Sequence, residues 1–366
     1  MARTWSRAVR LLREDIAQLT PYPAPPSLDE FARSIGMAPE AIVKLDQNEN
    51  PYGCSPRVIE ALRNYNWFHV YPDPLHRTLR ERLADYTGAP ARQIVVGNGS
   101  DEIIEILVRL FVAPGDRIIT ADPTFGYYAT VAAGAGAEFT ALPRGPRFEV
   151  DLDRILAALD RRTKLVFLAS PNNPTGNTTP LEVIQALLEH EVIVVVDEAY
   201  YEFCGRTALG LLRQGADNLV ILRTFSKWAG LAGIRLGYGI LPPDLADAAY
   251  RIRSPYSVSR AAEVAGIASL DDLAYLRSNV EKIRAERDRL AGALGAVTYL
   301  APHPSEANFI LCDVVERSAA DLQEALARRG ILVRRYSAPR LENSVRISVG
   351  RPEHTDRLLA ALREVS

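Results

Sequence analysis

The chain has 366 residues, of which 48% are hydrophobic and 24% are charged, a composition typical of a globular protein with a large buried core. Its formal net charge of -2 and its pI near 6.3 provide no basic surface for nucleic acid or an anionic membrane, so small polar ligands are expected. The three cysteines, Cys54, Cys204 and Cys312, form no Cys-x-x-Cys pair. This spacing indicates neither a zinc site nor a disulfide framework, and it favours a reducing cytoplasm.

The first residues favour an arm over a targeting signal. Four arginines lie in the first 13 residues, as in an organelle transit peptide, but two acidic residues follow at once and serine is sparse. Apolar residues instead recur at helical spacing and predict an amphipathic arm laid on the body or on a second subunit, namely Trp5, Val9, Leu12, Ile16 and Leu19. The longest unbroken apolar run, 192–196, is far too short to span a bilayer.

Short apolar runs rich in β-branched residues alternate with helical patterns through the middle of the chain. Runs that are apolar on both faces are typical of parallel strands covered by helices on both sides, and there are five, namely Ile94–Gly97, Arg117–Thr120, Lys164–Ala169, Val192–Val196 and Asn218–Leu222. Helix-period segments such as 102–111 and 181–190 lie between them. This order predicts an α/β domain with a mainly parallel central sheet over residues 55–255.

The pattern changes after residue 255. Apolar residues at helical spacing from Leu273 to Leu294 predict a long amphipathic helix that connects two domains. Three strand-like segments follow, alternating with helical patterns, namely 308–312, 331–334 and 345–349. We therefore expect a smaller α+β domain over residues 256–366, with residues 1–54 forming the N-terminal arm and part of this small domain.

Two polar motifs follow strands of the predicted sheet, where the ligands of doubly wound sheets gather. Asn173 lies in the proline-stiffened loop Ser170–Gly176, where its amide either faces a ring hydroxyl of a ligand or completes a simple turn. Asp197 ends an apolar strand, and a carboxylate buried there needs a cationic or donor partner. A protonated pyridine nitrogen is such a partner, although the residue suits a helix cap equally well.

Lys227 follows the hydroxyl of Ser226 and precedes Arg235 by eight residues. A lysine amine becomes a covalent catalyst when its site lowers its pKa and offers an aldehyde cofactor, and pyridoxal phosphate is the commonest such aldehyde. The hydroxyl and the arginine are suited to bind its phosphate. The spacing therefore indicates a pyridoxal-phosphate lysine and narrows the chemistry to amino acids and amines.

Two further motifs fit the same cofactor. Gly97–Glu102 precedes a helical pattern, so Ser100 and Asp101 are placed to present backbone N–H groups to a phosphate at a helix N-terminus, although most glycine-rich turns are only turns. Phe125, in Asp122–Tyr128, suits stacking on the pyridine ring or an ordinary core position. Each motif is weak evidence alone, but together the motifs suit binding of different parts of one phosphorylated pyridine aldehyde.

The motifs resemble those of the fold-type I pyridoxal-phosphate aminotransferases, and within that group the chain is most similar to the histidinol-phosphate aminotransferases. The similarity extends from Leu19 to the end and is carried by these stretches: Leu45–Gly53, Tyr71–Pro74, Gly97–Glu102, Ser170–Gly176, Val196–Tyr200, Leu222–Lys227, Ala232–Gly237, Ile331–Arg334 and Val345–Gly350. Two positions depart from the pattern. Arg335 doubles the charge beside Arg334, and Gln47 stands where alanine is common in the Asn-Glu-Asn motif.

The resemblance implies a role for each candidate cofactor residue. Lys227 carries the cofactor as a Schiff base and moves the substrate proton, which makes it the central catalytic residue. The nitrogen and the hydroxyl of the ring are bound by Asp197, Asn173 and Tyr200. The phosphate is bound by Ser100, Asp101, Ser226 and Arg235.

The resemblance also implies residues that bind the substrate or come from a second subunit. Tyr71 reaches the phosphate from the neighbouring subunit, which implies a homodimer with shared sites. Arg346 takes the α-carboxylate of the amino acid, and Arg334 and Tyr22 line the pocket for the phosphorylated substrate. From spacing alone, both arginines look like solvated charges on strands.

The expected reaction moves an amino group between glutamate or 2-oxoglutarate and histidinol phosphate or imidazole acetol phosphate, in histidine biosynthesis. Related enzymes share nearly all these residues, among them aromatic or specialised amino acid aminotransferases and threonine-phosphate decarboxylase, because fold and cofactor do not choose the substrate. A cofactor-sensing transcription regulator is disfavoured, since the arm before Tyr22 is too short for a DNA-binding module and the net charge is unsuitable.

Overall fold

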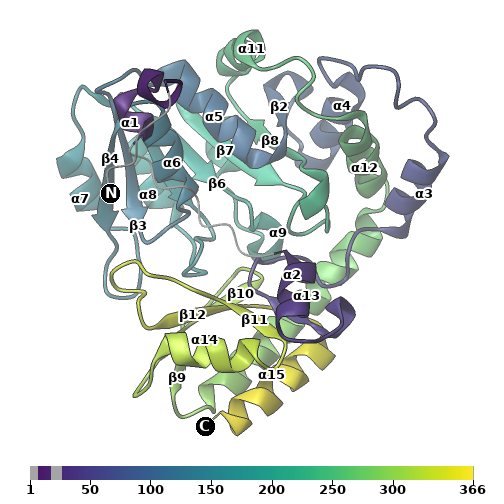
Figure 1. Ribbon diagram of the computed structural model, residues 1–366. Coiled ribbons are helices and arrows are strands. Elements are labelled where there is room, and N and C mark those ends of the chain that lie inside the picture. The colour runs from purple at the N-terminus through teal and green to yellow at the C-terminus, as the bar shows by residue number, and fades with distance from the viewer. Residues whose placement is uncertain (1–6, 18–26, 366) are drawn as a thin grey trace.

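The structure is a computed structural model that describes residues 7–17 and 27–365. A seven-stranded sheet occupies one part of the molecule and a five-stranded sheet the other, each covered by helices (Figure 1). The larger sheet has the strand order β2 (Ile94–Gly97), β8 (Gly237–Ile240), β7 (Leu219–Thr224), β6 (Ile193–Asp197), β5 (Thr163–Ala169), β3 (Arg117–Asp122) and β4 (Glu138–Pro143). We call the part built on this sheet the large domain.

All neighbouring strands of the larger sheet are parallel except β8, which pairs antiparallel with both β2 and β7. The prediction of a mainly parallel sheet is confirmed, but strand 94–97 does not pair with a parallel neighbour as expected, because β8 lies between it and β7. Two strands were missed. β8 has only four residues, of which two are glycines, a residue that is depleted in strands, and β4 is an edge strand with half-exposed residues.

Alternate residues of the central strands enter two different cores, which explains their unbroken apolar sequence. In β6, Val194 and Val196 belong to one hydrophobic cluster and Val195 belongs to the other. The Val195 cluster includes residues of α5 (Gly99–Phe111), α6 (Tyr127–Gly134) and α11 (Pro243–Ile252). The opposite cluster includes residues of α4 (Arg77–Thr87), α7 (Leu152–Ala158), α8 (Leu181–Leu188), α9 (Tyr201–Cys204), α10 (Leu209–Arg213) and α12 (Arg260–Leu270).

The five-stranded sheet has the order β1 (Val43–Leu45), β11 (Ile331–Arg335), β12 (Ser344–Ser348), β10 (Phe309–Val314) and β9 (Leu300–Pro302). β1 is parallel to β11, and the other pairs are antiparallel. The long helix α13 (Leu273–Gly295) packs near this sheet with α14 (Ala319–Ala327) and α15 (Pro352–Glu364), as Figure 1 shows. We call this part the small domain. The exact division at residues 55 and 255 stays a prediction.

The described part of the N-terminal arm contains two short helices. The described residues form a short 3-10 helix, η1 (Val9–Leu11), an extended Leu12 and a four-residue helix, α1 (Glu14–Ala17), that contacts α6. The amphipathic arm stays a prediction, because Trp5 and Leu19 lie outside the described residues, and Leu11 is 88% exposed. The remaining elements before the large sheet are α2 (Leu28–Ser34), η2 (Pro39–Ala41), α3 (Pro56–Asn64) and η3 (Ala91–Gln93), and η4 (Ala232–Ile234) precedes β8. Across the described ranges, no helix combines the length and apolar character needed to cross a bilayer.

Candidate active site

The candidate residues meet where adjacent strands of the large sheet end and face the small domain. β5, β6 and β7 are neighbours and parallel, so their carboxyl ends lie along one edge. Asn173 follows β5, Asp197 is the last residue of β6, and Lys227 lies three residues beyond the end of β7. The topology therefore brings together three residues that are well separated in the sequence.

Lys227 is partly buried and reaches toward the N-terminal part of the small domain. Its Nζ donates a hydrogen bond to the backbone oxygen of Gln47 at 3.1 Å and lies 6.0 Å from the ring centroid of Tyr200. Burial, followed by the positive charge of Arg346, lowers the pKa of Lys227 to about 8. A much larger fraction of this amine is therefore neutral near pH 7 than of an ordinary lysine, as a nucleophile requires.

Asp197 is buried, and it binds donors from both its own loop and a neighbouring helix. Its Oδ2 accepts a hydrogen bond from the hydroxyl of Tyr128 at 2.7 Å, and its Oδ1 accepts one from the backbone N–H of Ala199 at 3.1 Å. Burial raises its pKa to about 6. It does not cap the following helix, because Tyr200 occupies the N-cap position of α9. A buried carboxylate that has two donors, and no ion-pair partner among the described residues, suits a protonated ring nitrogen as a further partner.

Tyr200 is fixed by a residue from the Asn-Glu-Asn motif. Asn48 donates from Nδ2 to the Tyr200 hydroxyl at 2.9 Å. Asn48 adopts a left-handed backbone with φ of 56°, and both its backbone N–H and its Oδ1 bond the Ser348 hydroxyl at 2.9 Å. Burial raises the pKa of Tyr200 to about 12, so its hydroxyl stays protonated and is available as a donor at neutral pH.

Four residues converge at the N-terminus of α5. Ser100 and Asp101 lie in its first turn, where backbone N–H groups have no partner within the helix. Arg235 donates from Nη2 to Asp101 Oδ2 at 2.8 Å and from Nη1 to the Ser226 hydroxyl at 3.4 Å. Backbone donors, a hydroxyl and a guanidinium thus share one place, which is the chemistry that binds a phosphate.

Two glycines allow this close approach. A Cβ added to Gly99 would lie 2.4 Å from Arg235 Nη2, and one added to Gly237 would lie 2.3 Å from the backbone nitrogen of Ser100. Gly99 also has a φ of +76°, which L side chains rarely adopt. Only glycine at these positions lets β8 and Arg235 approach the first turn of α5.

Arg346, on β12, is buried and points across to the large domain. Its Nη1 donates to Asn173 Oδ1 at 2.6 Å and its Nη2 to the backbone oxygen of Asp46 at 2.5 Å. Its Nε is buried and has no hydrogen-bond partner among the described residues. Within residues 7–17 and 27–365, no carboxylate lies within ion-pairing distance of this guanidinium. The view of Arg346 as a solvated strand charge is therefore wrong.

Arg334 lies directly opposite Arg346 in the antiparallel pairing of β11 and β12. Directly opposed residues share a face of the sheet, and like charges placed there repel each other. Arg334 is half-buried, and over the described residues it too has no ion-pair partner. Two facing guanidinium groups without carboxylates indicate a position that an anionic ligand would stabilise.

The structure gives less support for the predicted roles of the remaining candidates, Phe125, Tyr71 and Tyr22. Phe125 packs edge-to-face on Tyr128 with ring centroids 5.5 Å apart, so stacking on a cofactor ring stays a prediction. Tyr71 is 76% exposed and stacks on Tyr256 at 4.5 Å, away from the site of its own chain. Tyr22 lies outside the described residues.

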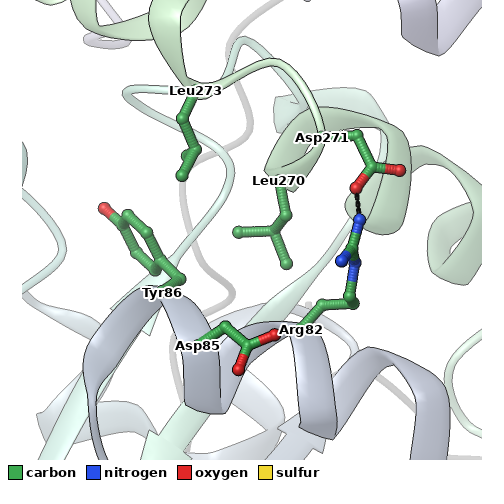
Figure 2. Close-up of a pocket in the computed structure, with 6 residues that line it drawn as sticks. All are labelled: Arg82, Asp85, Tyr86, Leu270, Asp271 and Leu273. Atoms are coloured by element: carbon green, nitrogen blue, oxygen red, sulfur yellow. Dashed lines mark ion pairs between the residues drawn. The ribbon is translucent and has the colours of Figure 1, made fainter.

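A separate cavity of about 310 Å³ lies between α4 and the turn that joins α12 to α13 (Figure 2). Arg82 forms an ion pair with Asp271 at its rim, and Tyr86, Leu270 and Leu273 supply apolar surface. Tyr86 also stacks on Trp228, the residue after Lys227, with ring centroids 5.4 Å apart. None of the candidate site residues that the structure describes lines this cavity, so it is distinct from the site formed by those residues.

Comparison with known proteins agrees with this geometry. Residues 40–362 match the family described as aminotransferase class I and II. The chain belongs to this family. The histidinol-phosphate aminotransferase of Roseiflexus castenholzii is 45% identical over 365 residues, which cover 97% of this chain and 98% of that protein. The chloroplastic histidinol-phosphate aminotransferase 1 of Arabidopsis thaliana is 42% identical and covers 96% of this chain and 85% of its own.

A solved structure is similar over the whole length of the aminotransferase. The crystal structure of histidinol-phosphate aminotransferase from Sinorhizobium meliloti in complex with pyridoxal-5'-phosphate has a TM-score of 0.87 and 30% sequence identity, with 100% of both chains covered. The predictions of the fold-type I aminotransferase fold and of pyridoxal phosphate as cofactor are confirmed at the level of the family.

The residues of this aminotransferase fit that cofactor. The α5 N-terminus with Ser226 and Arg235 would hold the phosphate, and the glycines described above leave room beside it. Asp197 would face the ring nitrogen, and in the part of the chain that the structure describes its buried carboxylate has no ion-pair partner. Lys227 would supply the amine. Each of these positions stays a prediction for the individual residue.

Several residues of the site escaped the sequence reasoning. Tyr128, the donor to Asp197, lies in the same motif as Phe125 but carried no separate signal. Glu198 accepts two hydrogen bonds from Arg223, at 3.0 and 2.8 Å, and this buried pair joins the ends of β6 and β7. An Asp-Glu pair at a strand end was the only available hint of it.

Proposed function

We propose that this aminotransferase transfers an amino group between glutamate or 2-oxoglutarate and histidinol phosphate or imidazole acetol phosphate, and so serves histidine biosynthesis. The observation that carries the proposal is the facing pair Arg334 and Arg346, since both substrates carry an anionic group, a carboxylate or a phosphate. The relatives that are 42% and 45% identical over nearly the whole chain bear the name of this enzyme.

Each site residue has a separate role in the proposed reaction. Pyridoxal phosphate, when bound, supplies an electron sink that stabilises negative charge at the substrate α-carbon. Lys227 Nζ removes the proton from that carbon and later donates a proton back. Its lowered pKa makes the neutral amine, which accepts the proton, more abundant near pH 7. Asp197 holds a proton on the ring nitrogen, and the protonated Tyr200 hydroxyl donates to the ring oxygen. Arg346 orients the carboxylate beside Asn173.

We also propose that the aminotransferase is a cytoplasmic homodimer in which Tyr71 enters the neighbouring subunit's phosphate site. Large exposed apolar side chains concentrate on one segment, namely Trp67, Phe68, Val70 and Tyr71. An exposed apolar patch of this kind favours an interface between proteins. The three cysteines are free, which suits a reducing compartment.

A substrate panel tests the proposed function. The purified aminotransferase is incubated with glutamate and a series of keto acceptors, including imidazole acetol phosphate, and release of 2-oxoglutarate is measured. We expect imidazole acetol phosphate to give the highest kcat/KM, and Lys227→Ala to give no turnover. If histidinol phosphate and its ketone are both inert while another pair reacts, the proposed substrate is wrong. Release of carbon dioxide from threonine phosphate would identify the decarboxylase instead.

A further inference from the structure

A small hydrophobic cluster joins the two domains beside the substrate arginine. It is separate from the two main cores and contains Phe148, Leu311 and Leu341, with Tyr336 packed against it. Phe148 lies in the connection between β4 and α7 of the large domain, whereas the other three belong to the small domain. One large-domain side chain, only 4% exposed, is therefore inserted into the small domain.

The turn that carries Phe148 is held in an uncommon conformation. Phe148 has a φ of 62°, which a non-glycine residue adopts only when surrounding contacts fix it. Its N–H bonds Gly145 O at 2.9 Å, and its carbonyl accepts from Arg144 Nη1 at 3.1 Å and from Asn177 Nδ2 at 2.9 Å. Asn177 lies just beyond the Asn173 loop. The backbone around Phe148 is thus tied to the loop that contributes to the active site.

Two small-domain groups hold the Phe148 ring. The Arg340 guanidinium lies 4.2 Å from the ring centroid, and the His303 ring packs edge-on at 5.0 Å. Arg340 also donates to three consecutive backbone oxygens of the large domain, at Arg144, Gly145 and Pro146, over 2.7, 2.6 and 2.9 Å. A cation over an aromatic ring that also donates three hydrogen bonds forms a specific contact. We call it the Phe148–Arg340 contact.

The contact lies next to Arg346. Leu311, which packs on Phe148, is directly opposite Arg346 in the pairing of β10 with β12, so their side chains share one face of the sheet. Tyr336, also packed on this cluster, has its ring 5.9 Å from the Arg346 guanidinium carbon. Any movement of the small domain at Phe148 therefore moves Arg346 relative to Asn173.

We infer that Phe148 and Arg340 are positioning residues for the amino acid substrate, because their contact across the domains sets the place of Arg346 at the site. The inference rests on the proposed role of Arg346 in binding the substrate carboxylate. Arg340 and Phe148 touch neither the cofactor residues nor Lys227 in any described contact. Loss of the contact should therefore weaken binding of the carboxylate and leave the binding of pyridoxal phosphate intact.

The test compares Arg340→Met and Phe148→Leu with the parent holoenzyme. Both substitutions keep apolar volume and remove the cation or the ring. We expect the dissociation constant of glutamate, measured from the absorbance change of the bound cofactor, to rise at least fivefold. The cofactor dissociation constant and the thermal unfolding midpoint should stay close to those of the parent. Arg340→Lys should recover part of the affinity, because it keeps the charge.

Arg206→Met is the matched control. Arg206 also bridges the domains, through Glu306 at 2.6 Å, but it lies at a different contact between them and is mostly exposed. It should change glutamate binding less than twofold. Normal glutamate binding in Arg340→Met and Phe148→Leu would overturn the inference, as would an equal loss in Arg206→Met. Because glutamate binding is measured without an acceptor, the inference survives if the panel above shows that histidinol phosphate is not the substrate.

Discussion

At the scale of single residues, the reactivity of the site depends on charges that are removed from water. Burial, followed by the positive charge of Arg346, disfavours the protonated form of Lys227, and together they outweigh the negative charges of Glu49 and Asp101, so the pKa is lowered. Burial also makes the charged form of Asp197 unfavourable, but for an acid this raises the pKa instead of lowering it. The two shifts bring both groups toward the pH range in which a cell works.

The pKa of Lys227 predicts how cofactor uptake depends on pH. Only the neutral amine attacks an aldehyde, so the second-order rate of reconstitution of the apoenzyme should rise about tenfold per pH unit below pH 8 and level off above it. Stopped-flow absorbance of pyridoxal phosphate binding measures this rate. A free lysine derivative under the same conditions should show a rise that continues to about pH 10. A rise that continues without a plateau to about pH 10 would contradict the lowered pKa.

The apolar runs proved to be strands, so their order along the chain was sufficient to place Asn173, Asp197 and Lys227 at one edge of the sheet, while the roles of these residues stay predictions. The hydrogen-bond partners of these residues could not be predicted in this way. Tyr128 reaches Asp197 from α6, which the sequence separates by 69 residues, and no local pattern encodes that contact. Arg346 was predicted only through the resemblance, because burial of a charge on a short strand cannot be read from its spacing.

At the scale of elements, the phosphate site depends on how closely β8 approaches α5. Gly237→Ala should push the first turn of α5 away, because the new Cβ would lie 2.3 Å from the Ser100 nitrogen. We expect a loss of about 1–3 kcal/mol in the free energy of unfolding, from overpacking. We also expect about tenfold weaker binding of pyridoxal phosphate, or about 1.4 kcal/mol. Chemical denaturation and a cofactor titration measure the two effects.

Gly292→Ala provides the control for this substitution. Gly292 lies within α13, no atom lies within 4 Å of its added Cβ, and its backbone is helical. Alanine there should stabilise the protein by about 0.5–1 kcal/mol and leave cofactor binding unchanged. Equal behaviour of the two variants would show that the approach of β8 to α5 is not the limiting feature.

The elements also show which sequence patterns are informative. Continuous apolar runs predicted the strands that are buried on both faces, and helical spacing predicted α13 over nearly its full length. The sequence patterns did not predict elements whose structure depends on contacts with other parts of the chain. β8 keeps its glycines because α5 lies against it, and an extended backbone at Leu12 separates Val9, in η1, from Ile16, in α1.

At the scale of the whole molecule, the exposed position of Tyr71 predicts shared sites. Mixing Lys227→Ala subunits with Tyr71→Ala subunits should restore activity, because one of the two sites in a mixed dimer then has both residues. With random exchange, about one quarter of the parent's sites should be native. Activity at limiting cofactor measures the recovery, and each variant alone provides the baseline. A mixture no more active than the two separate proteins would contradict a site shared through Tyr71.

The pairing of β1 with β11, and of Asn48 with Ser348, has a consequence for how the protein is made. These two residues are 300 positions apart, and together they hold the hydroxyl of Tyr200. A chain still growing on the ribosome contains the sheet of the large domain and Lys227 long before β11 and β12 have been synthesised. Because domains fold in order of synthesis, β1 and Asn48 stay unpaired until β11 and β12 have been made. Catalytic competence in this aminotransferase is thus acquired only when the last strands leave the ribosome.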